Sequence, residues 1–560
     1  MRYTISWQDP SDRLFDITIA FTAPADTPRL LLPAWRPGRY LIQNYAAQVR
    51  EWSASVGGDS RDIWKEAKST WRVEAKAGED VTVRYRFYAG VLDAGSSFLD
   101  FSEAWFNGSN LFMMVEGLRE KEATLTVAAP AEWRVETQLP RQESGTFRAR
   151  HYDHLIDSPT IAAETMTRYS IQESGAKIHL VLVGDEGIDT EQYVDALRVI
   201  VKVQAELFGG LPLDEYRFLV HVGDKWHGVE HESSCSIVAK RVDLLGATPG
   251  DEGHDHFLGI CSHEFFHVWN VKRIVPAAFT PYDYWKETPT KLLWVMEGVT
   301  SYYAQLTLVR GGLWDTNRYL KHLAQEIETL EGSPAQRHIS LSQASFDAWL
   351  QRDVHDRPNA VLDFYNKGEV VAALLDLTII RNTNGEKSLD DVMRILWQWR
   401  ILEEDAMPRA VAEVADVGDF FERYVDGTDK LPYSELFSGV GIGYDSRPRD
   451  DGRVGLGATF RQDNGKLVVA AVIRGGSTMH AGLLPGDELI GIDETRTSSE
   501  SDTKTVLRSL RDGDGVQLIV NRGGVIRSMS MIAAVDPRVT VTLTAEGESE
   551  LRGQWLTRNR

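Results

Sequence analysis

The sequence predicts a multidomain α+β protein, on three observations. At 560 residues the chain is too long for a single hydrophobic core, and typical domain sizes favour three or four units. Up to about residue 165, short segments that alternate apolar and polar residues are separated by Pro, Gly and Asp, which is typical of a β-sandwich. From about residue 260 to residue 430, apolar residues recur at helical spacing, so a mostly α-helical domain is expected there.

The N-terminal domain is assigned to residues 1–168 as an all-β unit. The clearest alternating segments, which we expect to be strands, are residues 2–7, 14–21, 81–88 and 123–128. Residues 32–40, L-P-A-W-R-P-G-R-Y, are rich in rigid turn residues and aromatic residues. This segment is either a structural loop, which is the favoured interpretation, or a wall of a substrate cleft.

A second domain is assigned to residues 169–436. It is expected to begin with a strand at 177–183, a helix of about two dozen residues that ends near residues 208–210, and a strand at 216–222. The polar segment 226–232, W-H-G-V-E-H-E, follows and precedes an apolar strand at 235–239. It is either a sheet edge that binds an extended peptide, with a carboxylate that holds the peptide's amino terminus, or a charged edge that discourages aggregation.

Residues 261–271, C-S-H-E-F-F-H-V-W-N-V, form a helix-sized stretch that carries the chemistry. His263 and His267 are four residues apart, so on a helix they project from one face and can share a metal ion. Glu264 then lies beside that ion. Zinc lowers the pKa of a bound water to about 7, and a neighbouring carboxylate can take the water's proton as it attacks a carbonyl. The motif predicts metal-assisted amide hydrolysis, unless it is a chance match to three letters.

Glu297 is the candidate third metal ligand. It is the one carboxylate within residues 291–308, a run with apolar residues at helical spacing. Burying an unpaired carboxylate costs several kcal/mol, roughly, and a divalent cation compensates that charge directly. Two His and one Glu with a fourth position for water is a known catalytic zinc arrangement. The alternative is that Glu297 pairs with a nearby Lys or Arg.

Tyr365 lies in D-F-Y-N-K-G-E, residues 363–369, before an apolar run suited to a buried helix. A phenol near the metal can donate a hydrogen bond to the oxyanion of a tetrahedral intermediate. The alternative is that this side chain only packs at the start of its helix. A further helix is expected after Ser388, which suits an N-cap.

Residues 437–536 resemble a PDZ domain. The glycine-flanked loop at 454–460 offers backbone N–H groups to a peptide carboxylate, and A-G-L-L-P-G-D-E-L-I-G-I-D, at 481–493, builds the adjoining turn and strand. The loop places Ala458 and Thr459 before Phe460, which departs from the usual G-L-G-F. Residues 537–560 are expected to add one strand and a charged tail.

Composition excludes several classes of function. A net charge of −21 leaves no excess of Lys or Arg to neutralise phosphates, so a nucleic-acid partner is not expected. The two cysteines, Cys235 and Cys261, give no disulfide framework. No signal peptide and no membrane-spanning run of about 20 apolar residues is visible. A soluble cytoplasmic protein without a membrane partner is expected.

The order of these motifs resembles the glycyl aminopeptidase family of zinc metallopeptidases. The resemblance spans nearly the whole chain: a β domain, H-E-F-F-H, W-V-M-E-G-V-T-S-Y-Y, F-Y-N-K-G and a terminal PDZ domain. It implies a catalytic domain similar to thermolysin and to the aminopeptidase N group. The stretch between His267 and Glu297 is longer than in aminopeptidase N relatives, and its aromatic run at 282–285 is a candidate wall of the substrate cleft.

The resemblance also implies residue roles. It makes Zn²⁺ the cofactor, with His263, His267 and Glu297 as its ligands and Glu264 as the general base. Tyr365 matches the tyrosine that stabilises the oxyanion. The segment H-G-V-E-H resembles the exopeptidase motif G-A-M-E-N, which makes Glu230 the group that binds the substrate's free α-amine and places Gly228 and His231 at the substrate.

The expected function is therefore removal of N-terminal residues, Gly or Ala according to the family name, from peptides with a free amino terminus. One alternative is an endopeptidase that uses the same metal site, with the PDZ domain recruiting proteins. Another is an inactive peptide-binding protein. The sequence leaves the physiological substrate, the PDZ ligand and the oligomeric state open.

Overall fold

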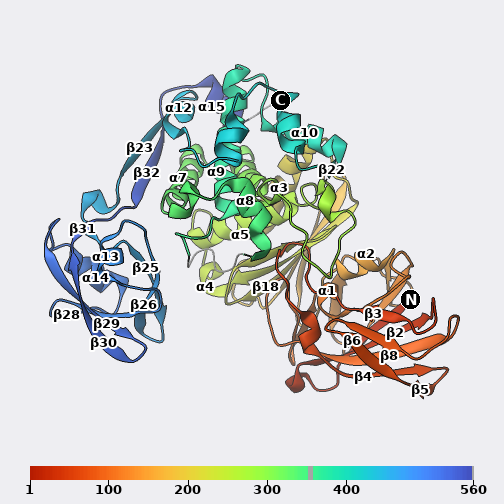
Figure 1. The fold of residues 1–560 in the computed structure, drawn as a ribbon. Coiled ribbons are helices and arrows are strands. Elements are labelled where there is room, and N and C mark those ends of the chain that lie inside the picture. Colours follow the sequence, from red (N-terminus) through yellow and green to blue (C-terminus); the bar gives the residue numbers. More distant parts are fainter. Residues whose placement is uncertain (351–356, 558–560) are drawn as a thin grey trace. The chain divides into compact units, whose positions relative to one another are not determined.

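The computed structural model describes residues 1–350 and 357–557, and the chain divides into two compact units (Figure 1). The first unit is Met1–Thr288 with Trp397–Glu403, and the second is Pro289–Leu396 with Glu404–Arg560. The predicted α+β multidomain class is confirmed. The predicted peptidase domain, 169–436, is distributed over both units.

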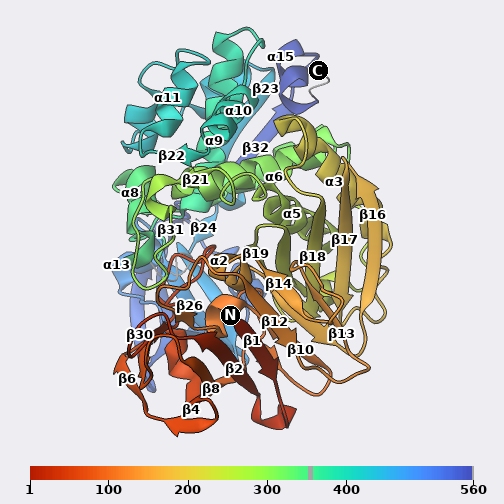
Figure 2. The same ribbon diagram turned by 90° about the vertical axis from the view of Figure 1, so that its right-hand side faces the viewer.

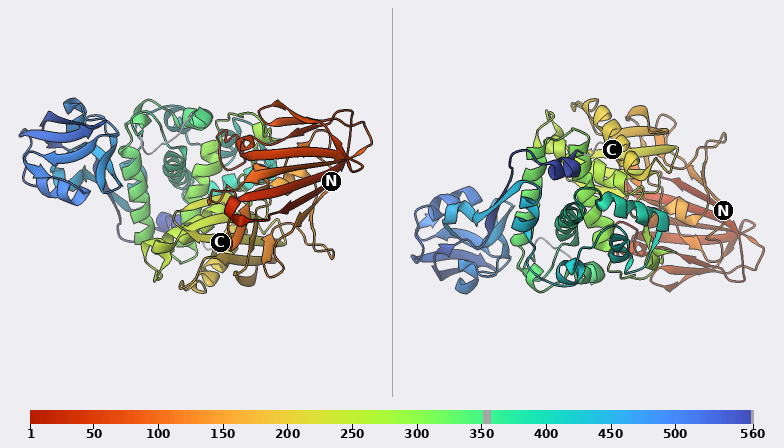
Figure 3. Two further views of the ribbon diagram at one scale, coloured as in Figure 1. Left: turned by 90° about the horizontal axis from the view of Figure 1, so that it is seen from below. Right: turned by 90° about the horizontal axis from the view of Figure 1, so that it is seen from above.

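The N-terminal part of the first unit is built from three β-sheets. The largest has the strand order β14-β12-β1-β2-β8-β4-β5, and Figure 3 shows its long strands side by side. All four segments expected to be strands are strands. In β2 every second residue is buried, which aligns Phe15, Ile17 and Ile19 on the core face. The bounds in the large sheet are β1 Arg2–Ser6, β2 Leu14–Thr22, β4 Val49–Val56, β5 Asp59–Arg61, β8 Asp80–Tyr88, β12 Ala123–Val127 and β14 Phe147–Ala149.

Two smaller sheets and two short helices complete this part. One sheet has the order β11-β3-β7-β6 and the other β13-β15-β10-β9. Their bounds are β3 Arg29–Leu31, β6 Ile63–Ala67, β7 Thr70–Val73, β9 Phe98–Leu99, β10 Glu103–Phe106, β11 Met114–Val115, β13 Arg134–Thr137 and β15 Thr160–Ala163, with helices α1 Gly108–Leu111 and α2 Tyr152–Ile156.

A five-stranded sheet with the order β16-β17-β18-β20-β19 carries the first half of the candidate site (Figure 2). Strands β17, β18 and β20 are parallel, whereas β19 is antiparallel to β20 and forms one edge, as both interpretations of segment 226–232 predicted. The bounds are β16 Thr167–Glu173, β17 Ala176–Val183, β18 Glu215–Gly223, β19 His227–Glu230 and β20 Ser234–Lys240, with helices α3 Gln192–Phe208, α4 Arg241–Leu244 and α5 Glu252–Phe266.

Two helices of this region differ from their predicted extents. Helix α3 has 17 residues and ends at Phe208, and Gly209, with a left-handed φ of 77°, is its C-cap. Helix α5, predicted over 261–271, begins at Glu252 and ends at Phe266, with His267 as its C-cap. The chain then turns, because the N–H groups of Val268 and Asn270 bond back to Phe265 and Phe266. His267 keeps helical dihedrals, so the i, i+4 geometry of the two histidines is preserved.

The second unit begins with helices that carry the other predicted site residues. A π-helical turn at Trp294–Gly298 runs directly into α6, Val299–Arg310. Gly298 and Gly368 of α9 approach so closely that a Cβ on Gly298 would lie 2.5 Å from the Gly368 Cα, which is why both positions need glycine. The remaining helices are α7 Thr316–Glu331, α8 Leu341–Phe346, α9 Phe364–Asn382, α10 Leu389–Trp399, α11 Ala406–Ala412 and α12 Tyr433–Ser438. The short paired strands β21 Val275–Pro276 and β22 Ile401–Leu402 belong to the first unit.

The PDZ-like part has the sheet order β25-β26-β27-β29-β30, with β25 at an edge and β28 paired to β27. Two pairs of strands frame it: β23 with β32, and β24 with β31. The bounds are β23 Ile442–Pro448, β24 Val454–Gly455, β25 Ala458–Asp463, β26 Lys466–Val472, β27 Glu488–Ile492, β28 Thr495–Arg496, β29 Gly515–Arg522, β30 Val525–Ile532, β31 Ala534–Val535 and β32 Val539–Ala545, with helices α13 Ser477–Ala481 and α14 Glu500–Leu507.

The C-terminal segment holds a helix that the sequence did not predict, α15 at Glu550–Leu556. Trp555 is fully buried, its indole N–H donates to the Tyr302 hydroxyl at 2.7 Å, and its carbonyl accepts from Arg310 at 3.3 Å. The segment after β32 is therefore packed onto α6 rather than being only a charged tail. Within the described residues, no helix is long and apolar enough to cross a membrane. Cys235 and Cys261 are both free and buried.

Candidate active site

The two motif histidines converge on one point. Their Nε2 atoms lie 3.1 Å apart. The Nδ1 atom of His267 lies 2.6 Å from the Asn270 carbonyl oxygen, to which it donates, so the neutral ring presents a bare Nε2 lone pair toward His263. Two nitrogens that bind one tetrahedral zinc at about 2.0–2.1 Å are about 3.3 Å apart, close to this separation. The pair therefore fits a shared metal ion.

Glu264 is held against the edge strand. Its side chain is 6% exposed, and its backbone carbonyl accepts a hydrogen bond from the Tyr216 hydroxyl at 3.3 Å. Gly228 of β19 lies opposite: a Cβ at that position would be 2.7 Å from the Glu264 carboxyl carbon. The missing side chain of Gly228 thus creates the space that the Glu264 carboxylate occupies.

Glu230 ends the same edge strand, and its carboxylate is 4% exposed. Its Oε1 has no hydrogen-bond partner in the described part of the chain. One carboxylate oxygen each of Glu230 and Glu264 and a ring nitrogen of His267 all lie within 4.8 Å of one another. Two buried carboxylates this close repel each other unless cations compensate them.

Gly38 closes this site from the N-terminal β domain. It has φ of 78°, in the left-handed region, and a Cβ there would lie 2.9 Å from Glu230 Oε1. The sequence analysis noted the turn at 32–40 but did not assign Gly38 to the site. The Pro37-Gly38 pair was the available signal, because such pairs mark tight turns whose glycine permits a close backbone approach. Asn270, which orients His267, was also missed.

His231 is turned to internal partners. Its Nδ1 lies 3.1 Å from Asp157 and its Nε2 lies 3.3 Å from the Ser236 hydroxyl. Burial lowers the pKa of His231, although Asp157 opposes that effect. Asp157 also forms an ion pair with Lys272 at 2.8 Å. Burial alone would raise the pKa of Asp157, but the positive charge of Lys272 and the hydrogen bond from His231 hold this pKa well below its usual value. His231 therefore positions the segment after Glu230, and its contact with substrate stays a prediction.

Glu297 and Tyr365 lie in the second unit. Glu297 is 2% exposed and belongs to the π-helical turn, a distortion often present at functional sites. Tyr365 is partly exposed at the start of α9, where Asp363 caps the helix by accepting from the Tyr365 N–H at 2.8 Å. The close approach of Gly298 and Gly368 brings their two segments side by side.

Comparisons with known proteins identify the chain. Family models match the Peptidase M61 N-terminal domain over residues 2–164, the M61 glycyl aminopeptidase over residues 256–371 and a PDZ domain over residues 454–532. The crystal structure of an aminopeptidase N family protein from Idiomarina loihiensis is 30% identical, covers 100% of both chains and has a TM-score of 0.94. An M1 zinc metallopeptidase from Deinococcus radiodurans is 14% identical over 77% of this chain and 93% of that chain, with a TM-score of 0.47. No curated protein matches.

The motif helix, the edge strand, the family models and the full-length match to the Idiomarina loihiensis structure define the class: the chain is a metallo-aminopeptidase, a peptide hydrolase. Its family follows from the full-length match and the family models together. The chain belongs to the M61 glycyl aminopeptidase family and carries a C-terminal PDZ domain. The family predicted from the sequence is confirmed.

Proposed function

We propose that this chain is a zinc-dependent aminopeptidase that removes small N-terminal residues, Gly or Ala, from peptides. The observation that carries the proposal is Glu230, a buried carboxylate whose Oε1 has no hydrogen-bond partner within the described part of the chain, placed beside Glu264 and His267. A substrate ammonium group supplies the positive charge and the N–H donors that this carboxylate lacks.

The metal ligands are His263, His267 and Glu297. The convergence of the two Nε2 atoms and the hydrogen bond from His267 to Asn270 support the histidines. Burial of Glu297 in a π-helical turn of an apolar helix supports this carboxylate as the third ligand. When bound, zinc polarises the scissile carbonyl and acidifies a water molecule.

Glu264 is the general base. Its carboxylate takes a proton from the attacking water and returns it to the nitrogen of the departing amine. Its burial beside Gly228 limits its alternative positions, so the carboxylate is held ready for this transfer. The hydroxyl of Tyr365 donates a hydrogen bond to the substrate oxygen as negative charge develops there, a contribution that often amounts to about 3 kcal/mol.

Glu230 makes the enzyme an exopeptidase. Because it binds the terminal ammonium, it fixes the first peptide bond as the one that is cut. The edge strand β19 offers backbone groups to an extended peptide next to Glu230, and Gly228 and His231 are the proposed neighbours of the bound substrate. Strand β25, at the edge of the PDZ sheet, offers a second place where a peptide or protein ligand binds.

The preference for small residues rests on the family to which the chain belongs. The competing function is an endopeptidase that uses the PDZ domain to recruit proteins, and it shares the same metal site. The two differ in whether a free amine is required.

Kinetics of Glu230→Gln test the proposal. The substitution keeps the size of the side chain and removes its charge, so we expect kcat/KM for Ala-Ala-amide to fall by about 100-fold, because a charge-assisted contact of roughly 3 kcal/mol is lost. Glu264→Gln is the comparison: it should abolish turnover with zinc still bound. If Glu230→Gln retains wild-type kcat/KM on free amines, Glu230 is not the amine anchor.

A further inference from the structure

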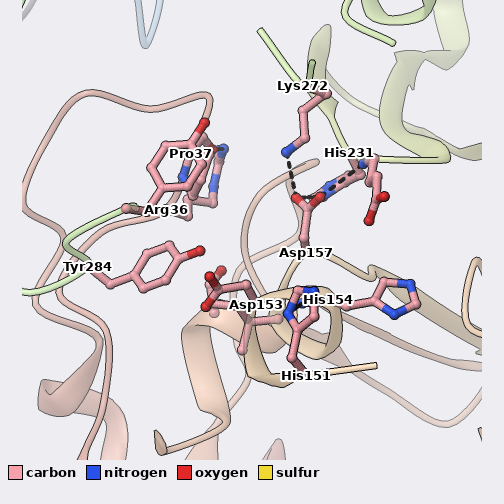
Figure 4. A pocket seen from close by; sticks show the side chains of 13 residues that line it. Arg36, Pro37, His151, Asp153, His154, Asp157, His231, Lys272 and Tyr284 are labelled. Atoms are coloured by element: carbon pink, nitrogen blue, oxygen red, sulfur yellow. Dashed lines mark hydrogen bonds and ion pairs between the residues drawn. The ribbon is translucent and has the colours of Figure 1, made fainter. Parts of the chain in front are cut away.

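Two segments that the sequence analysis singled out as possible cleft walls meet in the first unit. The Trp35 indole N–H donates to the Asp283 carbonyl at 2.7 Å, and the Ala34 N–H donates to the Tyr284 carbonyl at 2.7 Å. Between these segments and the His231-Glu232 turn lies a cavity of about 200 Å³. Figure 4 shows Arg36, Pro37 and Tyr284 on one side of it and His231, Asp157 and Lys272 on the other.

The cavity is smaller than the roughly 300–1,000 Å³ of pockets for drug-sized ligands, so it suits one side chain or one carboxylate group. Three acidic residues line it, and each already has a cationic partner. The pairs are Asp153 with Arg119, Asp157 with Lys272, and Glu232 with Arg150.

Arg36 also lines the cavity but, unlike these acidic residues, has no side chain of opposite charge in an ion pair with it within the described residues. It is 2% exposed, its Nη1 donates to the Pro37 carbonyl at 3.0 Å, and its Nε has no hydrogen-bond partner among the residues that the structure describes. Among the described residues no ion pair includes Arg36; Asp93, whose carboxylate interacts electrostatically with Arg36, makes no direct ion pair with it and lies 3.7 Å from a ring nitrogen of His227. A buried guanidinium without a carboxylate is costly, and an anion in the cavity would compensate it.

The positive charge of Arg36 also acts on the neighbouring His227. The pKa of His227 is lowered to about 4, first by burial and next by repulsion from Arg36, while Asp93 acts in the opposite direction. The Arg36 guanidinium packs against the backbone of Gly95. Only glycine leaves room for this contact, because a Cβ at Gly95 would overlap the guanidinium.

The cavity adjoins the proposed amine anchor. Gly38, two residues after Arg36, lies against the Glu230 carboxylate, and two residues span at most about 7 Å of chain. His231 and Glu232, which follow Glu230, line the cavity from the other side. A buried carboxylate and a buried guanidinium, neither of which forms an ion pair within the described residues, therefore flank the Pro37-Gly38 turn.

We propose that Arg36 and this cavity form a carboxylate subsite, so that the enzyme prefers peptides that carry a carboxylate close to their free amino terminus. The inference rests on the proposed function, because Glu230 must hold the ammonium group for the second charge to reach Arg36. The planar guanidinium binds a carboxylate through paired N–H donors, which a neutral amide of the same shape cannot replace. Two sources supply such a carboxylate behind a small first residue: an acidic second residue, or the free C-terminus of a dipeptide.

Matched substrate pairs distinguish these sources on the wild-type enzyme. The pairs are Ala-Glu-amide with Ala-Gln-amide, and Ala-Ala with Ala-Ala-amide. In one pair we expect kcat/KM of the carboxylate member to exceed that of its neutral partner by about ten-fold or more, and that pair identifies the source. If the neutral peptides are cleaved and no carboxylate member is preferred by more than two-fold, this inference is wrong and the aminopeptidase function stands. If no free-amine peptide is cleaved, the proposed function itself fails.

Variants then assign the preference to Arg36. Arg36→Gln should remove it, and Arg36→Lys should reduce it, because Lys keeps the charge but not the paired donors. Arg39→Gln is the matched control, since Arg39 is exposed in the same turn, carries the same charge and does not line the cavity. The Arg36 subsite is contradicted if Arg36→Gln still prefers the carboxylate peptides, or if Arg39→Gln loses this preference to the same extent. Either result would assign the preference to the overall positive charge of the loop.

Discussion

Gly228→Ala tests whether the position of Glu264 depends on the bare backbone of the edge strand. The added Cβ would lie 2.7 Å from the Glu264 carboxyl carbon, whereas carbon atoms in contact lie about 3.5–4.0 Å apart. The carboxylate must therefore move by about 1 Å. A misplacement of about 1 Å in a catalytic group can lower a rate by about 100-fold, and we expect kcat/KM to fall by that factor.

The assay is hydrolysis of Ala-Ala-amide, together with zinc content and thermal unfolding. Gly228 lies in a strand and has no positive φ, so alanine itself should stabilise the strand by about 0.5–1 kcal/mol, and a rate loss cannot be attributed to unfolding. Gly515→Ala is the control, because Gly515 is also a strand residue and its Cβ would meet no atom within 4 Å. A Gly228→Ala enzyme within three-fold of wild type would refute the assigned contact.

Three further predictions concern other parts of the chain. Gly38→Ala should raise KM for free-amine peptides by about ten-fold or more, because its left-handed φ is strained for alanine and its Cβ would displace the Glu230 carboxylate; unchanged KM would contradict this contact. Burial raises the pKa of Glu326 to about 7. The folded state therefore keeps a proton that the unfolded chain releases above about pH 4.5, and stability falls as the pH rises through that window. Glu326→Gln should unfold at a higher temperature than wild type at pH 8, by the equivalent of about 1–3 kcal/mol, and at the same temperature near pH 4. Trp555→Phe should lower the midpoint of thermal unfolding, because the Tyr302 hydroxyl loses its indole donor at a cost of about 1–3 kcal/mol; an unchanged midpoint would show that α15 does not stabilise α6.

Local patterns were sufficient to predict the elements of the site. The spacing of His263 and His267 placed both rings on one helical face, and the polar segment around Glu230 was recognisable as a sheet edge because charged residues interrupt the apolar strands beside it. The same holds for the N-terminal strands, whose alternation is set by one buried face. Each of these predictions depends only on residues within about ten positions of one another in the sequence.

Contacts between distant segments could not be predicted in this way. Trp35 and Asp283 are 248 positions apart, and Tyr302 and Trp555 are 253 apart, so no local period reports their pairing. Arg36 is unusual only because the acids around it already have other partners, which is a property of the packed cavity. The π-helical turn at Glu297 was also missed, because apolar spacing over a few residues does not distinguish it from an α-helix.

The most direct test of the aminopeptidase assignment is to compare free and N-acetylated Gly and Ala peptides, with and without a chelator, and to identify the bond that is broken. We predict that only the free peptides are cleaved, one residue from the amino terminus, and that chelation abolishes cleavage until zinc is restored. Cleavage of the acetylated peptides at internal bonds would contradict the role of Glu230 and would favour an endopeptidase.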